Sequence, residues 1–319
     1  NSPAPGVKPS AMIKTTLPAF ALACTLGFGT MGCIKEALLN GQIEGTRKAS
    51  AGVDSLSDYE VANTAAFAGL AQFEGMHYLA PQNEDALFLL TKTWTSAGFA
   101  FIEDQMEQAE DTDGAGSELY VYQQQRTKAA YDRAIHYGVQ MLEMKNQGFE
   151  AAKKNDASMK AWLSAFDDAA HDAPELFWVG YAWIARVNVM KEDPAMVSEL
   201  FVGVKIIERV VELDDTFFYG NAHNILGSYH ARSAMAELDD SKKEFDKAIA
   251  ISKGQLLLPK FQMATKYYCM KGDKENYVKT LQEVVDAGDT MPEQRLSNAI
   301  AKRKAKRYLG KERMKNCGF

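Results

Sequence analysis

The sequence predicts an all-α protein, an irregular array of antiparallel helix pairs that together form an α-solenoid. From Tyr59 onward, apolar residues recur near the 3.6-residue spacing of helices. The breaks between these stretches are short and carry turn residues, as at 80–83, 113–116 and 271–273. No segment shows the alternating pattern of a strand bounded by hairpin turns. The chain of 319 residues has only 9 prolines, which also favours helices.

Helices are expected over most of the chain after residue 58. No linker between them is long enough to force a second domain, so residues 59–319 are expected to form one helical domain. The predicted helices span residues 59–79, 83–109, 117–145, 158–169, 174–190, 194–213, 217–236, 241–252, 255–271, 274–287 and 292–309.

Residues 222–252 resemble a tetratricopeptide repeat. In such a repeat, a small residue lies where two helices touch, and an apolar stripe follows on the second helix; Gly227 and Phe245 fit these two positions. Looser copies place Gly180 and Ala264 at the small position. Each pair would bury its apolar face by stacking on its neighbours. The alternative is an unrelated all-helical bundle.

The N-terminus has the pattern of an export signal. Residues 1–11 look like an upstream extension, and whether they are native stays open; Met12 is the more natural start. Lys14 and an apolar run over 17–32 follow it, which is typical of a secretory signal. A membrane-spanning helix needs roughly 20 apolar residues, so a permanent anchor is the weaker interpretation. We therefore assign residues 1–32 to the extension and signal peptide.

The signal ends in Thr30-Met31-Gly32-Cys33, which resembles the lipobox of bacterial lipoproteins. The resemblance implies that Cys33 is lipidated and that residues 33–58 form the lipidated N-terminus and a linker. Ile34 stands where an aspartate would retain the protein at the inner membrane, so the outer membrane is favoured. The alternative is an ordinary cleaved signal with an incidental cysteine.

Two further cysteines, Cys269 and Cys317, remain in the predicted mature chain. An oxidising periplasm permits a bridge between them. The sequence leaves open whether they form that bridge or stay as free thiols.

Composition and motifs do not indicate an enzyme or a nucleic-acid binder. The net charge is −6, whereas neutralising phosphates needs a basic surface. No histidine pair has metalloprotease spacing, and no nucleophile elbow, P-loop or dinucleotide fingerprint is present. We therefore expect no catalytic residue, no metal and no cofactor. The acidic run 103–110 is interpreted as an exposed helix face, and the basic segment 302–315 as a solvated helix that caps the array or meets an acidic partner.

Taken together, the order and spacing of short segments resemble the T component of TRAP transporters, the TatT family. The resemblance covers roughly residues 33–309. The C-terminal half carries it at 174–183 (PELFWVGYAW), 191–195 (KEDPA), 207–215 (IERVVELDD), 220–223 (GNAH), 226–229 (LGSY), 245–249 (FDKAI) and 292–305 (PEQRLSNAIAKRKA). The N-terminal half carries it at 74–75, 87–90, 100–102, 131–134 and 137–138.

This resemblance implies a non-catalytic periplasmic lipoprotein with a tetratricopeptide-like fold. It implies an accessory role in a tripartite ATP-independent periplasmic (TRAP) transporter, and binding to its substrate-binding P component. It also implies a cleft or pore for a small organic acid or hydrophobic solute, and it is compatible with a homotrimer. The alternative function is a general scaffold lipoprotein that holds other envelope proteins together.

In a tetratricopeptide-like array, the first helix of each pair lines the concave face, and helical spacing selects the residues that point inward. Aromatic walls with a few amides, hydroxyls and one arginine would suit a polar solute or a peptide segment. The alternative is that these side chains only fill the core, and we interpret Trp178, Trp183 and His223 as packing residues. The predicted ligand- or partner-binding residues are Phe177, Tyr181, Asn221, Asn224, Ser228, Arg232, Phe261, Thr265 and Tyr268.

Overall fold

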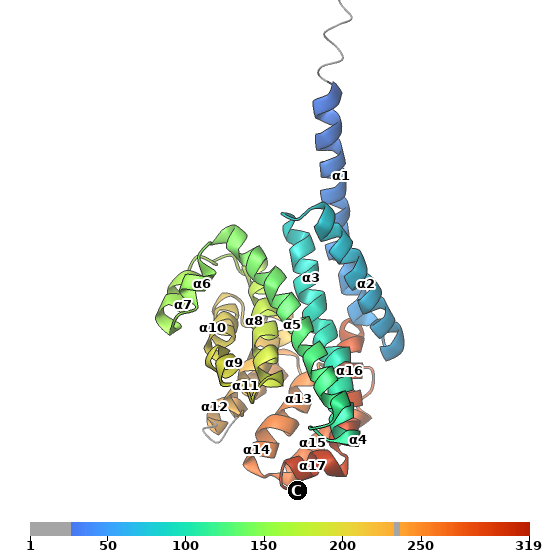
Figure 1. Ribbon diagram of the computed structural model, residues 1–319. Coiled ribbons are helices and arrows are strands. Elements are labelled where there is room, and N and C mark those ends of the chain that lie inside the picture. Colours follow the sequence, from blue (N-terminus) through green and yellow to red (C-terminus); the bar gives the residue numbers. More distant parts are fainter. Residues whose placement is uncertain (1–26, 233–236) are drawn as a thin grey trace, which may run out of the picture. The chain divides into compact units, whose positions relative to one another are not determined.

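Every regular element in residues 27–232 and 237–319, the part of the chain that the computed structural model describes, is helical (Figure 1). The predicted all-α array is therefore confirmed. The chain divides into two units, residues 1–42 and Ile43–Phe319. Most of the predicted signal peptide lies outside the described residues. The backbone of Cys33 belongs to α1 (Gly27–Ala49), but its side chain also lies outside what the structure describes.

The helices follow one another with short connections. In chain order after α1 they are η1 (Ser50–Ser55), α2 (Tyr59–Leu79), α3 (Glu84–Ala97), η2 (Gly98–Ile102), α4 (Glu103–Asp113), α5 (Glu118–Lys145), α6 (Phe149–Ala152), α7 (Asp156–Leu163), α8 (Ala169–Val189), α9 (Pro194–Ser198), α10 (Leu200–Leu213), α11 (Phe217–His230), α12 (Leu238–Ile251), α13 (Leu258–Gln262), η3 (Met263–Tyr268), α14 (Cys269–Lys271), α15 (Lys274–Asp286), η4 (Pro292–Gln294), α16 (Arg295–Tyr308) and α17 (Lys311–Asn316). Helical structure also occupies most of residues 33–58, the predicted linker.

Capping residues set several of the helix starts. The side chain of Asp58 accepts hydrogen bonds from the backbone at the start of α2, and that of Asn83 does so for α3. One predicted start was wrong: α8 begins at Ala169, because Asp168 caps it, and not at Pro174. Consequently the predicted helix 158–169 ends earlier, as α7, at Leu163.

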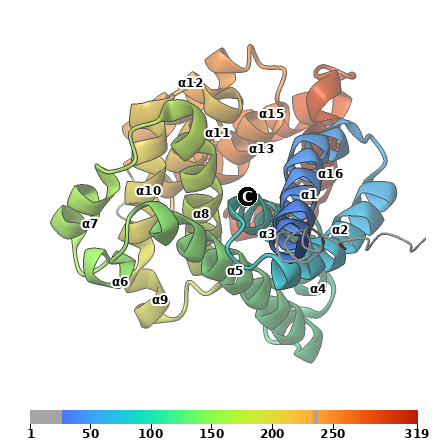
Figure 2. The same cartoon turned by 90° about the horizontal axis from the view of Figure 1, so that it is seen from above.

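Within residues 43–319, neighbouring helices pack in the order of the chain. The order is α2 on α3, α3 on α5, α5 on α8, α8 on α10, α10 on α11 and α11 on α12 (Figure 2). Two predicted close-contact glycines lie at these interfaces. A Cβ on Gly180 would lie 2.9 Å from the side chain of Ile207, and one on Gly227 would lie 2.9 Å from the ring of Phe245. Only glycine lets these helices approach so closely.

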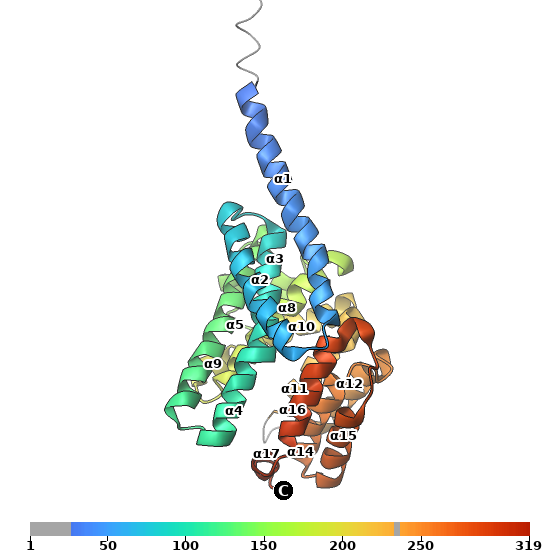
Figure 3. The same cartoon turned by 90° about the vertical axis from the view of Figure 1, so that its right-hand side faces the viewer.

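The last helices return to the first. α16 packs on α15, contacts α2 and η1 as well, and η4 contacts η1 (Figure 3). The array in residues 43–319 therefore closes on itself instead of ending in two free caps.

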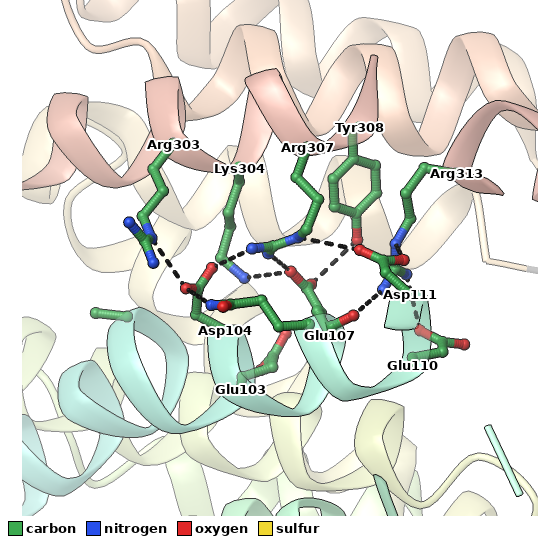
Figure 4. A network of polar contacts seen from close by, with 12 residues as sticks. Glu103, Asp104, Glu107, Glu110, Asp111, Arg303, Lys304, Arg307, Tyr308 and Arg313 are labelled. Carbon is green, nitrogen blue, oxygen red and sulfur yellow. Dashed lines mark hydrogen bonds and ion pairs between the residues drawn. The ribbon is translucent and has the colours of Figure 1, made fainter. Parts of the chain in front are cut away.

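An ion-pair network between α4 and α16 holds this closure together (Figure 4). Arg307 donates to Asp104 over 2.6 Å and also pairs with Glu107. Lys304, which is buried, donates to Glu107 over 3.0 Å, and Arg303 donates to Asp104 over 3.0 Å. The interpretation of 103–110 as an exposed face and of 302–315 as a solvated helix was therefore wrong, because each segment neutralises the other.

Charge complementarity decides the ionisation of this network. Burial by itself would raise the pKa of Glu107, but the neighbouring Lys304 and Arg307 outweigh it and lower that pKa to about 2. The pKa of Asp104 is lowered in the same way, with Arg307 as the strongest of its cations. Both carboxylates are therefore ionised near neutral pH.

The start of α11 departs from ordinary helical backbone. Phe218, Tyr219 and Gly220 have φ of 46°, 59° and 76°. The left-handed region costs non-glycine residues roughly 1–2 kcal/mol each, so the surrounding packing must hold Phe218 and Tyr219 there.

Cys269 and Cys317 form a disulfide, which decides the question that the sequence left open. The bridge ties the segment after α17 to α14. In residues 27–232 and 237–319, no helix has both the length and the apolar character of a membrane span.

Candidate functional site

An apolar cavity with a volume of about 290 Å³ lies where the first and last helices of the body meet. Its wall combines segments that are far apart in the sequence. Phe73 comes from α2, Ser96 from α3, Phe99 from η2, Leu258 from α13 and Ile300 from α16. The cavity therefore exists only because the array closes.

Polar atoms make up the smaller part of this wall. Lys92 lies beside Asp54, with Nζ 3.3 Å from Oδ2, and both are only partly exposed. Asn221 and Gln294 add amide groups. A mostly apolar cavity with a few polar groups is the usual form of a small-molecule site.

A second cavity, of about 500 Å³, adjoins the first. The two share Asp54, Lys92, Trp178, Phe218 and Gln294 in their walls. The Asp54–Lys92 ion pair and two aromatic rings therefore lie where the cavities meet.

Aromatic packing fixes this boundary. The rings of Trp178 and Phe218 lie 5.6 Å apart, and those of Trp178 and Tyr181 stack at 6.3 Å. The left-handed backbone at Phe218 directs its ring into this cluster, so the strained start of α11 forms part of the cavity wall.

Ionisable groups lie beside Tyr181 and Phe99, two aromatic residues of the cavity wall. Tyr181 contacts Phe99 with ring centres 5.9 Å apart, and burial together with nearby Glu103 raises the pKa of its hydroxyl. Glu103 accepts a hydrogen bond from Tyr131 over 2.7 Å, and burial raises its pKa.

Two of the predicted binding residues, Tyr181 and Asn221, line the 290 Å³ cavity. Phe177 has no exposed surface, and its ring packs 5.4 Å from that of Phe217. Phe177 is therefore a buried packing partner of the aromatic rings at the boundary between the two cavities.

Three further predicted binding residues, Asn224, Ser228 and Arg232, lie on α11 or directly after it. Asn224 is buried and donates to the side chain of Asn221 over 2.9 Å, which orients that cavity-lining amide. Ser228 donates to the backbone oxygen of Asn224. Arg232 is exposed and lies over the ring of Tyr229 at 4.1 Å.

The last three predicted binding residues, Phe261, Thr265 and Tyr268, lie on α13 and η3. Phe261 is buried and packs against Tyr308, with ring centres 5.2 Å apart. Thr265 is buried and donates to the backbone of Phe261, while Tyr268 is half-buried beside Tyr267.

Of the residues interpreted as packing, Trp183 and His223 are buried, and His223 is hydrogen-bonded to Glu244. Trp178 packs as expected but also lines both cavities. Most of the wall was not predicted from the sequence, since it comes from elements such as α2, α3 and η2, where no binding residue was expected. One signal was present, namely the small residues Ala65, Ala66 and Gly69, which leave space on one face of α2.

Side chains of the types that can bind a metal ion cluster outside the two cavities. Among the described residues, two groups of three could hold an ion, and neither shares a residue with the wall of these two cavities. They are Glu84, His171 and Glu175, and His230, Glu237 and Asp240.

The fold and the cavities define a class of protein: a closed helical array with a mostly apolar cavity. A family model described as TRAP transporter T-component matches residues 56–314. The chain belongs to this family, as its sequence resemblance indicated. Comparison with curated proteins gives no significant match.

Proposed function

We propose that this protein is a non-catalytic accessory of a TRAP transporter that holds an organic solute in its apolar cavity and assists its transfer to the transporter. Membership of the T-component family supports the link to transport. The observation that carries the proposal is the 290 Å³ cavity. It lies between the helices that close the array, and mostly apolar surface lines it.

The cavity chemistry favours an elongated solute with an apolar body and one polar or anionic end. The apolar body would lie against Phe73, Phe101 and Ile300. Lys92 would meet an anionic end at the junction of the two cavities, in exchange with its present partner Asp54. Tyr181 and Asn221 are the predicted binding residues that we assign to this solute.

The working partner that we propose is the P component, the substrate-binding protein of the transporter. Arg232 and Tyr268, which are not among the residues of the cavity wall, are candidates for that protein contact. We also propose lipidation at Cys33, a periplasmic location at the outer membrane, and a homotrimer. The disulfide supports an oxidising compartment.

A cavity-filling variant tests solute binding. Ser96→Phe places a ring into the cavity from α3, whereas Ser198→Phe is a matched control on exposed α9. Both serines donate to a backbone oxygen three residues earlier. With anilinonaphthalene sulfonate as the probe, we expect Ser96→Phe to lose most of the fluorescence gain and Ser198→Phe to keep it. Equal dye binding by both variants would count against the cavity.

Purification from membranes tests the partner. Mass spectrometry of proteins that co-purify with the lipidated chain should identify a P component. If only other envelope proteins are recovered and no solute is bound, the scaffold alternative is favoured. Replacing Cys33 by Ala should release the protein from the membrane fraction if lipidation anchors it.

A further inference from the structure

Three potential metal ligands converge between α3 and α8, outside the walls of both cavities. Glu84 is the first residue of α3, and His171 and Glu175 lie one turn apart on α8. One ligand atom from each of the three lies within 4.8 Å of the others. Nε2 of His171 is 2.7 Å from Oε1 of Glu84 and 3.9 Å from Oε1 of Glu175.

One oxygen of the buried carboxylate in this group lacks a hydrogen bond. Glu175 is only 2% exposed, and its Oε1 has no hydrogen-bond partner among the described residues. Its nearest guanidinium nitrogen is Nη2 of Arg47 at 3.9 Å, but Arg47 donates its other terminal nitrogen to Asp85 over 2.8 Å. A buried carboxylate oxygen of this kind requires a proton or a cation beside it.

The nearby carboxylate of Glu84 increases the requirement for a proton or a cation beside Glu175. Carboxylate oxygens of Glu84 and Glu175 lie within 4.8 Å of each other. Burial and the adjacent Glu84 together raise the pKa of Glu175 to about 9, while Arg47 opposes the shift. Two carboxylates that face each other cannot both stay ionised without a positive charge between them. Without an ion, the pair would have to share a proton.

We propose that Glu84, His171 and Glu175 bind a divalent transition-metal ion, for which Zn²⁺ is the representative probe. One imidazole nitrogen and two carboxylate oxygens are a donor set that suits Zn²⁺ and related ions better than Mg²⁺ or Ca²⁺. Tetrahedral bonds of about 2.0–2.2 Å separate neighbouring ligand atoms by about 3.3–3.6 Å. The separations of 2.7 and 3.9 Å lie on either side of this range, so small side-chain rotations suffice.

The surroundings also suit a metal-bound histidine. Nδ1 of His171 lies 3.5 Å from Oδ1 of Asp172, which directs Nε2 towards the two glutamates. Asp172 is itself fixed, because Lys145 and the backbone nitrogen of Asp168 donate to it. The half-exposed His171 ring leaves a route for the ion and a position for water.

The ion would connect α3 to α8. Glu84 precedes Phe88 by one turn, and Glu175 directly follows Pro174; both Phe88 and Pro174 line the 500 Å³ cavity. Metal occupancy would therefore stiffen one wall of that cavity. This inference does not depend on the proposed transport function.

Calorimetry on the full chain, without an affinity tag and after treatment with a chelator, tests the site. At neutral pH we expect one Zn²⁺ per chain, a Tm higher by several degrees with Zn²⁺, and no comparable effect of Mg²⁺. His171→Ala and Glu175→Gln should each weaken Zn²⁺ binding at least about tenfold. His230→Ala, in the second and more exposed group, is the matched control and should bind as the unmodified chain does.

Two results would overturn the inference. One is the absence of any Zn²⁺ binding by the unmodified chain, which would assign a shared proton to the carboxylate pair. The other is unchanged binding by His171→Ala and Glu175→Gln together with lost binding by His230→Ala. Circular dichroism of each variant verifies that it is folded, and exposed His171 is a position where alanine should not disturb the core.

Discussion

Arg307 donates a hydrogen bond from Nη1 to Oδ1 of Asp104 over 2.6 Å, across 203 positions of the sequence. This contact joins α16 to α4 and so helps to close the helical array. The cavity wall takes Leu296 and Ile300 from α16 and Phe101 from the segment just before α4. The stability of the closure and the integrity of the cavity are therefore linked.

Replacing Arg307 by Met should destabilise the fold by about 3 kcal/mol, because Asp104 and Glu107 would each lose a buried cation. Urea unfolding measures this loss. Arg295→Met is the control, because Arg295 pairs with Asp289 at the surface and should cost less than about 1 kcal/mol. Similar losses in both variants would contradict a special role for the α4–α16 network.

Acid should weaken the same network. The pKa of Glu107 is about 2 in the folded protein against an ordinary value of 4.5, since Lys304 and Arg307 outweigh burial. The stability that this depressed pKa contributes is complete above the ordinary value and is lost as the pH falls towards 2.

Glu107→Gln should therefore be less stable than the unmodified chain at neutral pH, and its stability should fall less steeply in acid. Urea midpoints measured from neutral pH down to about pH 3 test this. Neighbouring Glu103 has a raised pKa, chiefly through burial and partly through the charge of Glu107, so Glu107→Gln also relieves Glu103 and the difference between the two proteins reports on the pair. Parallel pH profiles for the two proteins would refute the assignment.

The close contact between α11 and α12 at Gly227 leaves no room for a larger residue. Gly227→Ala should destabilise by about 1–3 kcal/mol, since the new Cβ would lie 2.9 Å from the ring of Phe245. Gly75→Ala on exposed α2 has no atom within 4 Å of its new Cβ and should stabilise by about 0.5–1 kcal/mol. Thermal unfolding distinguishes them; a destabilised Gly75→Ala or a neutral Gly227→Ala would be unexpected.

Local patterns predicted the helices well because apolar periodicity and capping residues act over a few positions. The positions of Gly180 and Gly227 at helix contacts also followed from such a pattern. The same pattern says which face of a helix is apolar but not which segment covers it. Hence α4 and α16 were each interpreted as solvated, although they neutralise each other.

The site was harder to predict for the same reason. Tyr181 and Asn221 were identified because they lie one helix pair apart, where the repeat register applies. Gly69 and Ile300 lie on opposite ends of the chain and share a wall only after closure. The left-handed turn at Phe218 has no sequence signal beyond Gly220, because tertiary packing imposes it.

The disulfide gives the last prediction. Cys269 and Cys317 are 48 positions apart, and closing a loop of that length should stabilise the fold by about 4 kcal/mol in the chain-entropy account. A reductant should therefore lower the guanidinium midpoint of the unmodified chain. Cys317→Ser should have the lower midpoint from the start and show no further response to the reductant. A reductant effect of equal size in both proteins would mean that this bridge is not its target.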